Sequence, residues 1–287
     1  MDVLLVDLQD IGARYYTYVS TAVGLARQAA RVGKRVVVLD RPDPIGGALV
    51  QGNVRDSIGD PDSDFVGFLP VSMRHGMTLG ELMRLADARL GLHADLIIVP
   101  AAGWRRDMAY DATGLPWVRP SPNMPSLESA FHYPGLCLFE GTNLSIGRGT
   151  GVAFQVIGAP WLDPAALLAR LRKVGQALEG VEVVVDSFTP RQPTDGKYDG
   201  LALPGLRFRV SDRARYDPTR LAIALLAALL ALHPTSVQFR AEGFDRLASG
   251  PQLREALLRG RTAPEIWRTW EESLARFRRE RGKYLLY

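Results

Sequence analysis

The segment 136–150, L-C-L-F-E-G-T-N-L-S-I-G-R-G-T, joins a short apolar run to a loop of chemically versatile side chains. Four hydrophobic residues in a row suit a strand buried on both faces, and in open α/β sheets ligands bind at the loop that follows such a strand. The polar residues of this loop are Glu140, Asn143, Ser145 and Arg148. Glycines on both sides of Arg148 would let the backbone approach a bound molecule closely. The pattern predicts a strand at 136–140 and a binding site at its carboxyl end.

A second group of polar side chains follows the first apolar run of the chain. It comprises Asp7, Gln9, Asp10, Arg14, Tyr16 and Tyr18. Carboxylates and amides can make paired hydrogen bonds to sugar hydroxyls, and aromatic faces can stack on the sugar ring. The alternative is an Asp that caps a helix, with tyrosines in the core. Both interpretations stay open for Asp7 and Asp10, whereas packing is favoured for Tyr18.

Further candidate ligands lie in two long irregular stretches, 41–77 and 101–125, because loops of that length inside a compact domain tend to be functional. They are Arg41, Arg74, His75 and Asn123, and Asp40 directly precedes the first stretch. His75 directly precedes a predicted helix, whose N-terminus could tune the pKa of the imidazole. A lone histidine is more often structural, but His75 lies at the end of a long loop, where functional residues are common. A role in catalysis and a role in packing are therefore weighed equally.

Several other chemistries lack their expected spacing. The remaining histidines are not arranged as metal ligands, and neither H-E-x-x-H nor C-x-x-C occurs, so we expect no metal. Gly147–Gly151 matches neither G-x-G-x-x-G nor a P-loop, which weakens a nucleotide-binding interpretation. Ser145 lacks the G-x-S-x-G turn of a nucleophilic serine. Cys137, the only cysteine, excludes an internal disulfide and is expected to pack in the core.

The bulk composition is that of an ordinary globular protein, with 47% hydrophobic and 23% charged residues in 287. The net charge of +4 suits an anionic ligand, but the arginines are dispersed, so nucleic acid is not indicated. The most apolar predicted helix, 221–232, is too short to span a bilayer. No signal peptide precedes the first predicted strand, which begins directly after the initiating methionine.

The first half of the chain reads as an α/β domain. Strands at 3–7 and 35–40 enclose an alanine-rich helix at about 20–31, which predicts a βαβ unit with parallel strands. Asp7 and Asp40 should then end neighbouring strands on the same rim. A short strand at 65–69, a helix opened by the capping box at 78–81, and a strand at 95–99 follow.

The second half changes character. Asp-Pro and Thr-Ala-Pro-Glu signals predict helices from 163 to 180, from 217 to 232 and from 262 to about 282, with strands at 181–186 and 206–210. A short helix near 126–132 leads into the 136–140 strand. We therefore predict a Rossmann-like parallel-sheet domain over 1–145, incomplete at its beginning, and a smaller α+β domain over 146–287, with a cleft between them at the 140–150 loop.

Taken together, eight ordered blocks of the sequence resemble the NamZ-type exo-β-N-acetylmuramidases. The blocks are D-L-Q-D-I-G-A-R-Y-Y-T-Y, V-L-D-R-P-D-P-I-G-G, R-H-G-M-T-L-G-E-L, G-W-R-R, S-P-N-M-P, Y-P-G-L-C-L-F-E-G-T-N-L-S-I-G-R-G-T, I-G-A-P-W and the closing Y-L-L-Y. They run from about residue 2 to the end of the chain. The resemblance implies a cofactor-independent hydrolase that removes N-acetylmuramic acid from the non-reducing ends of peptidoglycan fragments, in the periplasm or outside the cell.

The resemblance also implies roles for the candidate residues. The lactyl carboxylate of N-acetylmuramic acid would pair with a guanidinium, for which Arg148, Arg14 and Arg74 are the candidates. Glu140 and Asp10 are the expected catalytic participants, with His75 as an orienting group or proton shuttle. The substrate-binding set is Asp7, Gln9, Arg14, Tyr16, Asp40, Arg41, Arg74, Asn123, Asn143, Ser145 and Arg148.

This sequence departs from the family pattern at its beginning. A G-P-E-H-G-like segment, whose Glu is the family's expected catalytic acid, has no match here. We therefore expect the natural polypeptide to begin earlier. Two alternatives to the hydrolase stay open: a sugar-binding remnant without catalysis and, with less support, a nucleotide-dependent Rossmann enzyme.

Overall fold

The computed structural model describes residues 2–287, which form two compact units. The first unit contains the chain up to Pro120 together with Glu272–Tyr287, and the second unit contains Ser121–Glu271. The division therefore lies earlier than the expected one after residue 145. The reason is local, because residues 127–141 are helical and pack against helices of the second unit rather than ending a strand of the first.

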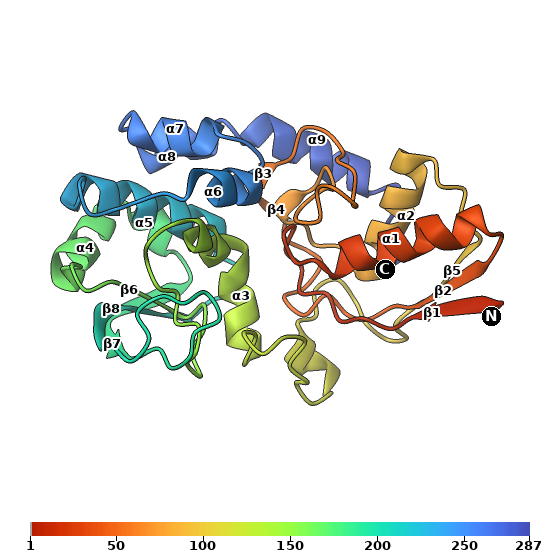
Figure 1. Cartoon of the computed structure of the whole chain (residues 1–287), viewed down its shortest axis with the longest axis horizontal. Helices are drawn as coiled ribbons and strands as arrows, with labels where there is room; N and C mark the ends of the chain where they lie inside the picture. The colour runs from red at the N-terminus through yellow and green to blue at the C-terminus, as the bar shows by residue number, and fades with distance from the viewer. Residues whose placement is uncertain (1) are drawn as a thin grey trace. The chain divides into compact units, whose positions relative to one another are not determined.

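A parallel three-stranded sheet forms the centre of the first unit. Its order is β1 (Val3–Val6), β2 (Arg35–Leu39), β5 (Leu96–Val99). Helices α1 (Tyr18–Arg31) and α2 (Leu79–Leu90) lie on one face of this sheet (Figure 1). The predicted βαβ unit is thus confirmed, and parallel pairing of β1 with β2 brings Asp7 and Asp40 to the same rim.

The two faces of this sheet differ. Val6, Val36 and Val38 point into a core shared with α1 and α2. The alternate residues Val3, Leu5, Leu39, Ile97 and Val99 are 37–63% exposed. Although parallel sheets are usually covered on both faces, helices cover only one here (Figure 1). β1 forms an edge of the described sheet.

The long stretch between β2 and α2 contains an antiparallel pair, β3 (Gln51–Val54) and β4 (Ser72–Arg74), which the sequence did not predict. The strand predicted at 65–69 is wrong, because those residues form turns. The capping box at Thr78 and the left-handed Gly91 stop of α2 are confirmed. A 3-10 turn, η1 (Tyr110–Thr113), and helix α9 (Glu271–Arg281) complete this part of the chain.

An antiparallel sheet of order β6-β8-β7 forms one layer of the second unit. Its strands are β6 (Val156–Gly158), β7 (Val181–Phe188) and β8 (Leu203–Val210), and the helices packed over it are α3 (Leu127–Leu136), α4 (Pro164–Leu171) and α5 (Pro218–Leu232). The strand predicted at 136–140 is wrong. These residues end α3 and form a 3-10 turn, η2 (Cys137–Gly141), since a fully buried apolar run has no period that separates helix from strand.

Short helices complete the second unit: η3 (Gly175–Leu178), α6 (Ala241–Ala248), α7 (Gln252–Leu258) and α8 (Ala263–Arg268). The helix predicted from 163 stops at Leu171, and the one predicted from 262 is split between α8 and α9. Over residues 2–287, no helix is both long and apolar enough to cross a bilayer.

Candidate active site

Two adjoining cavities open at the carboxyl edge of the parallel sheet, where ligands bind in open α/β sheets. The larger, about 550 Å³, is lined by Asp7, Asp40 and Arg41 together with Trp104 and other mainly apolar residues. The smaller, about 320 Å³, is lined by Gln9, Tyr18 and Tyr110, and it shares Asp7 and Arg41 with the first. Both volumes suit one sugar unit. This edge of the first unit therefore combines a hollow with hydrogen-bonding and aromatic groups.

The two residues that line both cavities, Asp7 and Arg41, form a half-exposed ion pair. Arg41 Nε donates to Asp7 Oδ1 at 2.6 Å, and this guanidinium lowers the pKa of Asp7. The pair uses only Nε of Arg41. Its two terminal nitrogens have no partner among the described residues, so they can take a ligand.

Asp40 has a different environment from Asp7, although the two end neighbouring strands. Its carboxylate accepts from Thr78 Oγ1 at 2.6 Å, from the Gly80 amide at 2.8 Å and from Tyr287 at 2.9 Å. Burial raises its pKa, an effect that these three donors oppose. Asp40 thus bonds both to the start of α2 and to Tyr287. These bonds fix the position of its carboxyl group in the lining of the larger cavity.

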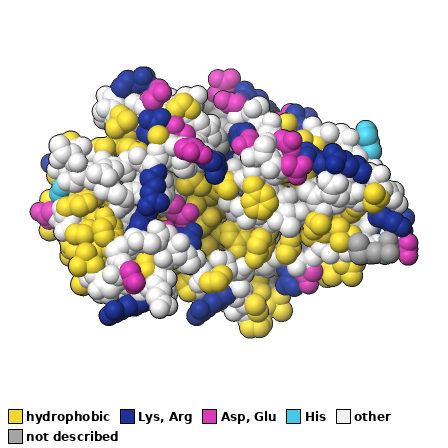
Figure 2. Space-filling model, in the orientation of Figure 1, with side chains coloured by type: hydrophobic (Ala, Val, Ile, Leu, Met, Phe, Trp, Pro, Cys, Tyr) yellow, Lys and Arg dark blue, Asp and Glu magenta, His cyan; other side chains and the backbone are white. Residues whose placement is uncertain are grey.

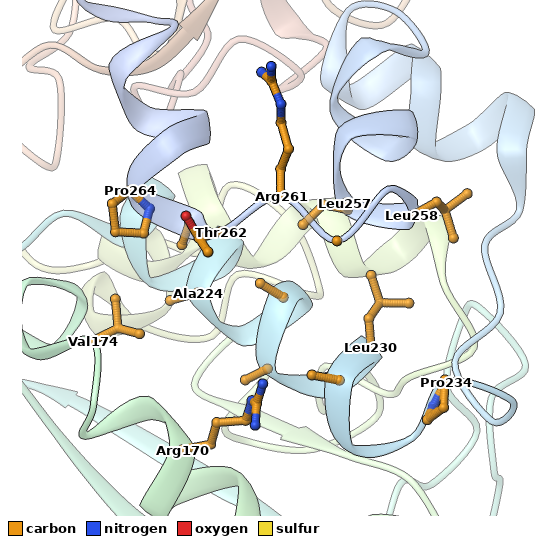
Figure 3. Close-up of a pocket in the computed structure, with 15 residues that line it drawn as sticks. Arg170, Val174, Ala224, Leu230, Pro234, Leu257, Leu258, Arg261, Thr262 and Pro264 are labelled. Atoms are coloured by element: carbon orange, nitrogen blue, oxygen red, sulfur yellow. The ribbon is translucent and has the colours of Figure 1, made fainter.

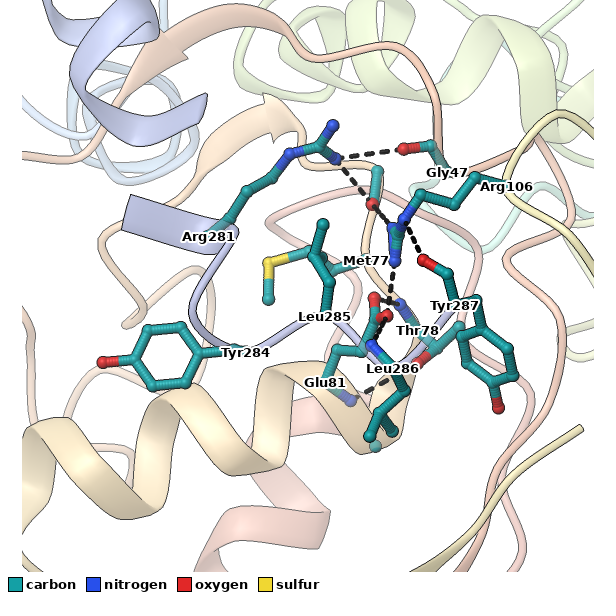
Figure 4. Close-up of polar contacts among 12 residues, drawn as sticks. Gly47, Met77, Thr78, Glu81, Arg106, Arg281, Tyr284, Leu285, Leu286 and Tyr287 are labelled. Atoms are coloured by element: carbon teal, nitrogen blue, oxygen red, sulfur yellow. Dashed lines mark hydrogen bonds and ion pairs between the residues drawn. The ribbon is translucent and has the colours of Figure 1, made fainter. Parts of the chain in front are cut away.

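The end of the chain lies beside Glu81 at the start of α2 (Figure 4). The Leu286 amide donates to Glu81 Oε1 at 2.8 Å, and Arg106 forms an ion pair with the same carboxylate. Arg281 Nη1 donates to three backbone carbonyls, of Gly47 at 3.0 Å, His75 at 3.1 Å and Gly76 at 2.7 Å. Residues more than two hundred positions away in the chain therefore hold the loop that carries His75.

Asp10 and His75 meet in the interior of the first unit, 4% and 0% exposed. His75 Nδ1 accepts from the Met77 amide at 3.1 Å, so the neutral ring carries its proton on Nε2, which lies 3.7 Å from Asp10 Oδ1. Burial and nearby arginines lower the pKa of His75 to about 3. The ring therefore stays neutral near pH 7.

Asp43 belongs to the same buried region, and the sequence analysis did not select it. Burial raises the pKa of Asp43 to about 8 and that of Asp10 to about 7. The signal was available, because Asp43 stands between two prolines in D-R-P-D-P-I-G-G. The expected ligand Tyr16 is also buried, and its ring contacts Tyr18 edge to face at 4.9 Å between centroids.

Arg14 and Arg74, two of the three guanidinium groups expected to bind a carboxylate, are engaged by the chain itself. Arg14 donates to the Asn53 carbonyl at 2.8 Å and to its side-chain oxygen at 3.1 Å. Arg74 donates to Gln51 Oε1 at 3.1 Å and to the Ile45 carbonyl. With exposures of 2% and 3%, both arginines hold the 45–74 stretch in place.

Gln9, another expected ligand, keeps a side-chain oxygen available. Its Oε1 has no hydrogen-bond partner among the described residues.

The predicted loop residues of the second unit form a separate polar group. Arg148 Nε donates to Glu140 Oε1 at 2.9 Å, and Arg148 Nη2 contacts the same oxygen. Arg148 Nη1 donates to Thr194 Oγ1 at 3.1 Å, which also accepts from Asn123. The side chains of Arg148 and Glu140 are 18% and 27% exposed. All three guanidinium nitrogens of Arg148 therefore already have partners within the unit.

Lys197, which the sequence analysis missed, binds backbone carbonyls of the segment 139–144. Its ammonium group donates to the carbonyls of Phe139 at 3.1 Å, Glu140 at 3.4 Å and Leu144 at 2.9 Å. Burial lowers its pKa to about 8. A lysine in a loop at 189–202 has no sequence pattern that distinguishes it from a solvated one, so only the fold reveals this role.

Two expected sugar ligands of the second unit have structural contacts instead. The Asn143 amide group donates to the Ser236 carbonyl at 2.8 Å and accepts from the Gln238 amide at 3.0 Å. Ser145 is buried, pairs with Gly158 through the backbone, and accepts from the Gly147 amide at 3.2 Å. Cys137 is buried, as expected of a packing residue.

One cavity of the second unit lacks such groups. A cavity of about 370 Å³ in the second unit, lined mainly by apolar residues of α5 and of 257–264, has no carboxylate or imidazole in its lining (Figure 3). On the face in Figure 2, Lys and Arg side chains alternate with Asp and Glu ones and form no single basic field. No group of three potential metal ligands occurs in residues 2–287.

Comparison with protein families covers the whole chain. Residues 1–128 match the family described as "Exo-beta-N-acetylmuramidase NamZ, N-terminal" and residues 131–287 match its "C-terminal" counterpart. A peptidoglycan beta-N-acetylmuramidase NamZ of Bacillus subtilis (strain 168) is 37% identical over 289 residues, which are all of this chain and 68% of that protein.

Two crystal structures of DUF1343 family proteins from Bacteroides fragilis have the same fold. The first has a TM-score of 0.88 at 31% sequence identity, and the second has a TM-score of 0.77 at 30%. Each comparison covers all of this chain and 75% of the solved chain. The predicted mixed α/β fold is thus confirmed.

Proposed function

Since the chain belongs to the NamZ family of exo-β-N-acetylmuramidases, we propose that it is a glycoside hydrolase that removes N-acetylmuramic acid from the non-reducing ends of peptidoglycan fragments. The single observation that supports this most strongly is the match of both family regions along the whole chain. The cavities at the sheet edge agree in size and in lining with a single amino sugar.

We assign acid–base work to Asp10, a buried carboxyl of the same unit as the cavities. Glycoside cleavage needs a proton for the leaving oxygen and, on the other face of the ring, a second group or the substrate's own 2-acetamido group. A carboxyl that keeps its proton near neutral pH can be that donor, and burial gives Asp10 this property. The neutral His75 is assigned a positioning role, because its Nε2 lies 3.7 Å from Asp10 Oδ1. Glu140 is assigned a positioning role, through its ion pair with Arg148.

Arg41 is the guanidinium that we assign to the lactyl carboxylate of the substrate. It lines both cavities, its side chain is 42% exposed, and both terminal nitrogens are free for a bidentate contact. Arg148 is the second candidate, but a carboxylate would have to displace Glu140 from it.

The test uses two chromogenic substrates that differ only in the lactyl group, 4-nitrophenyl β-N-acetylmuramide and 4-nitrophenyl β-N-acetylglucosaminide. Wild-type protein should hydrolyse the muramide with much the higher kcat/KM. Arg41→Met should lower this ratio by about tenfold to a hundredfold, the value of one charge-assisted contact, while Arg148→Met preserves it.

The outcomes separate the alternatives. If only Arg148→Met lowers the preference in kcat/KM for the muramide over the glucosaminide, the site for the lactyl carboxylate lies in the second unit. Absence of turnover combined with a thermal shift in N-acetylmuramic acid would indicate a sugar-binding protein without catalysis. A thermal shift with a nicotinamide nucleotide, and none with N-acetylmuramic acid, would overturn the proposed function.

A further inference from the structure

Two buried carboxyl groups of the first unit meet at Gly12. The Gly12 amide donates to Asp10 Oδ1 at 2.8 Å. On the other side, a Cβ at position 12 would lie 2.5 Å from Asp43 Oδ1 and 2.9 Å from its Oδ2. Gly12 also has a φ of +81°. Glycine is therefore required here twice, for its backbone conformation and for the space that the Asp43 carboxyl occupies.

In each of these carboxyls, one oxygen accepts a hydrogen bond and the other has no partner among the described residues. Asp43 Oδ1 accepts from the Ile45 amide at 3.1 Å, as Asp10 Oδ1 does from Gly12. The Oδ2 atoms of both, and Nε2 of His75, are buried without a hydrogen-bond partner among the described residues. Asp10 and Asp43 are only 4% and 2% exposed. Buried polar atoms are rarely left unpaired in native structures, so three together call for a chemical explanation.

The charges around the pair oppose full ionisation. The titratable and charged groups that face it are Asp40, Glu81, Arg74, Arg281, His75 and Tyr16. Arg74 favours the carboxylate form of Asp43, whereas Glu81 and Asp10 disfavour it. His75 adds no positive charge, because burial and the nearby arginines keep its ring neutral. Two negative charges at this place would thus repel each other inside a poorly solvated interior.

We propose that Asp43 and Asp10 form an electrostatically coupled carboxyl pair, in which Asp43 is a positioning residue that keeps a proton available on Asp10. A proton on either carboxyl turns an unpartnered acceptor oxygen into a donor and removes one of the two like charges. The role of the pair in hydrolysis rests on the proposed function, but the pair itself does not depend on it.

The experiment is a pH titration of the full chain labelled with 13C at the aspartate carboxyl carbons, followed by NMR without substrate. In wild-type protein, two aspartate carbons should keep the chemical shift of a protonated carboxyl at pH 6 and titrate between pH 6 and 9. In Asp43→Asn one of these signals is lost, and Asp10 should titrate at a lower pH because its partner's charge is gone. Asp10→Asn should shift the titration of Asp43 in the same direction.

Asp56→Asn is the matched control, because this aspartate is exposed whereas both carboxyls of the pair are buried. It should remove one signal and leave the two high-pH titrations in place. The pair is overturned if no aspartate carbon of the wild-type protein titrates above pH 6, or if neither Asn substitution moves the other residue. Failure of the proposed function would show instead as absent muramide turnover with this titration intact. A shift of the pH dependence of kcat in Asp43→Asn would connect the pair to hydrolysis, and an unchanged profile would contradict its positioning role.

Discussion

The two units each contain a polar group around a carboxylate, but they satisfy that carboxylate differently. In the first unit, Asp10 and Asp43 are buried together, each with one unpartnered oxygen and a raised pKa. In the second unit, Glu140 forms an ion pair with Arg148, and Lys197 fixes the backbone beside it.

The difference indicates a division of labour. A buried carboxyl oxygen without a hydrogen-bond partner lowers the stability of the folded protein. Such unpaired groups are characteristic of functional sites, where a shifted pKa is needed. A carboxylate that already pairs with a guanidinium is better suited to holding a shape or a charge. We therefore place proton transfer in the first unit and assign the second unit's polar group to positioning.

The largest effect is expected from Asp10→Asn. If Asp10 donates the proton, kcat on the chromogenic muramide should fall by about 10²- to 10⁴-fold, the usual contribution of one general acid. KM should change much less, and the exposed Asp56→Asn control should retain wild-type kcat. A kcat for Asp10→Asn within a few fold of wild type would remove proton transfer from the first unit.

A stability effect is expected next, from Lys197→Met. The substitution leaves the carbonyls of Phe139, Glu140 and Leu144 without their buried donor, so urea unfolding at pH 7 should show a loss of about 2–4 kcal/mol. Lys173→Met, at an exposed position, should stay within about 0.5 kcal/mol of wild type. Equal stability of the two variants would mean that the ammonium group does not hold the loop.

Glu140→Gln should have a smaller effect on activity than Asp10→Asn, because the account gives Glu140 no proton to transfer. We expect kcat to fall by less than about tenfold, which corresponds to the loss of one partly exposed ion pair. Steady-state kinetics on the muramide measure this directly. If Glu140→Gln lost as much kcat as Asp10→Asn, the division between the units would be wrong.

The smallest effect is expected from Asp7→Asn. The Asp7–Arg41 pair is half exposed, and such pairs contribute about 0–1 kcal/mol to stability. Unfolding should therefore change little, while KM for the muramide stays the same or decreases because Arg41 loses a competing carboxylate. A large increase in KM would show instead that Asp7 itself binds the sugar.

The sequence was sufficient for elements whose signals are local. The βαβ unit and the capping box at Thr78 follow from periodicity and end signals within a few residues, and both are confirmed. The run 136–140 was assigned to a strand because complete burial removes the amphipathic period. Its helical state depends on packing against α5 and α6, whose positions the local sequence does not contain.

The candidate site was predictable to a similar degree. The sequence correctly placed Asp7 and Asp40 on one rim, because strand direction determines that. It could not separate Arg41, with free nitrogens, from Arg14 and Arg74, whose guanidinium groups bind distant carbonyls. It also missed Asp43 and Lys197, since the burial of a charged side chain depends on residues far away in the chain.

The central claim, that buried carboxyls of the first unit keep their protons at neutral pH, is tested most directly by unfolding free energies between pH 6.5 and 8. A raised folded-state pKa means that stability is fully present below about pH 4 and is lost as pH rises through about 7 and 8. His75 and Lys197, with lowered pKa values, change protonation on unfolding mainly below and above this window. Wild-type protein should therefore lose about 2 kcal/mol across it, and the Asp10→Asn/Asp43→Asn double variant should lose almost nothing. Equal pH dependence in the two proteins would contradict the account.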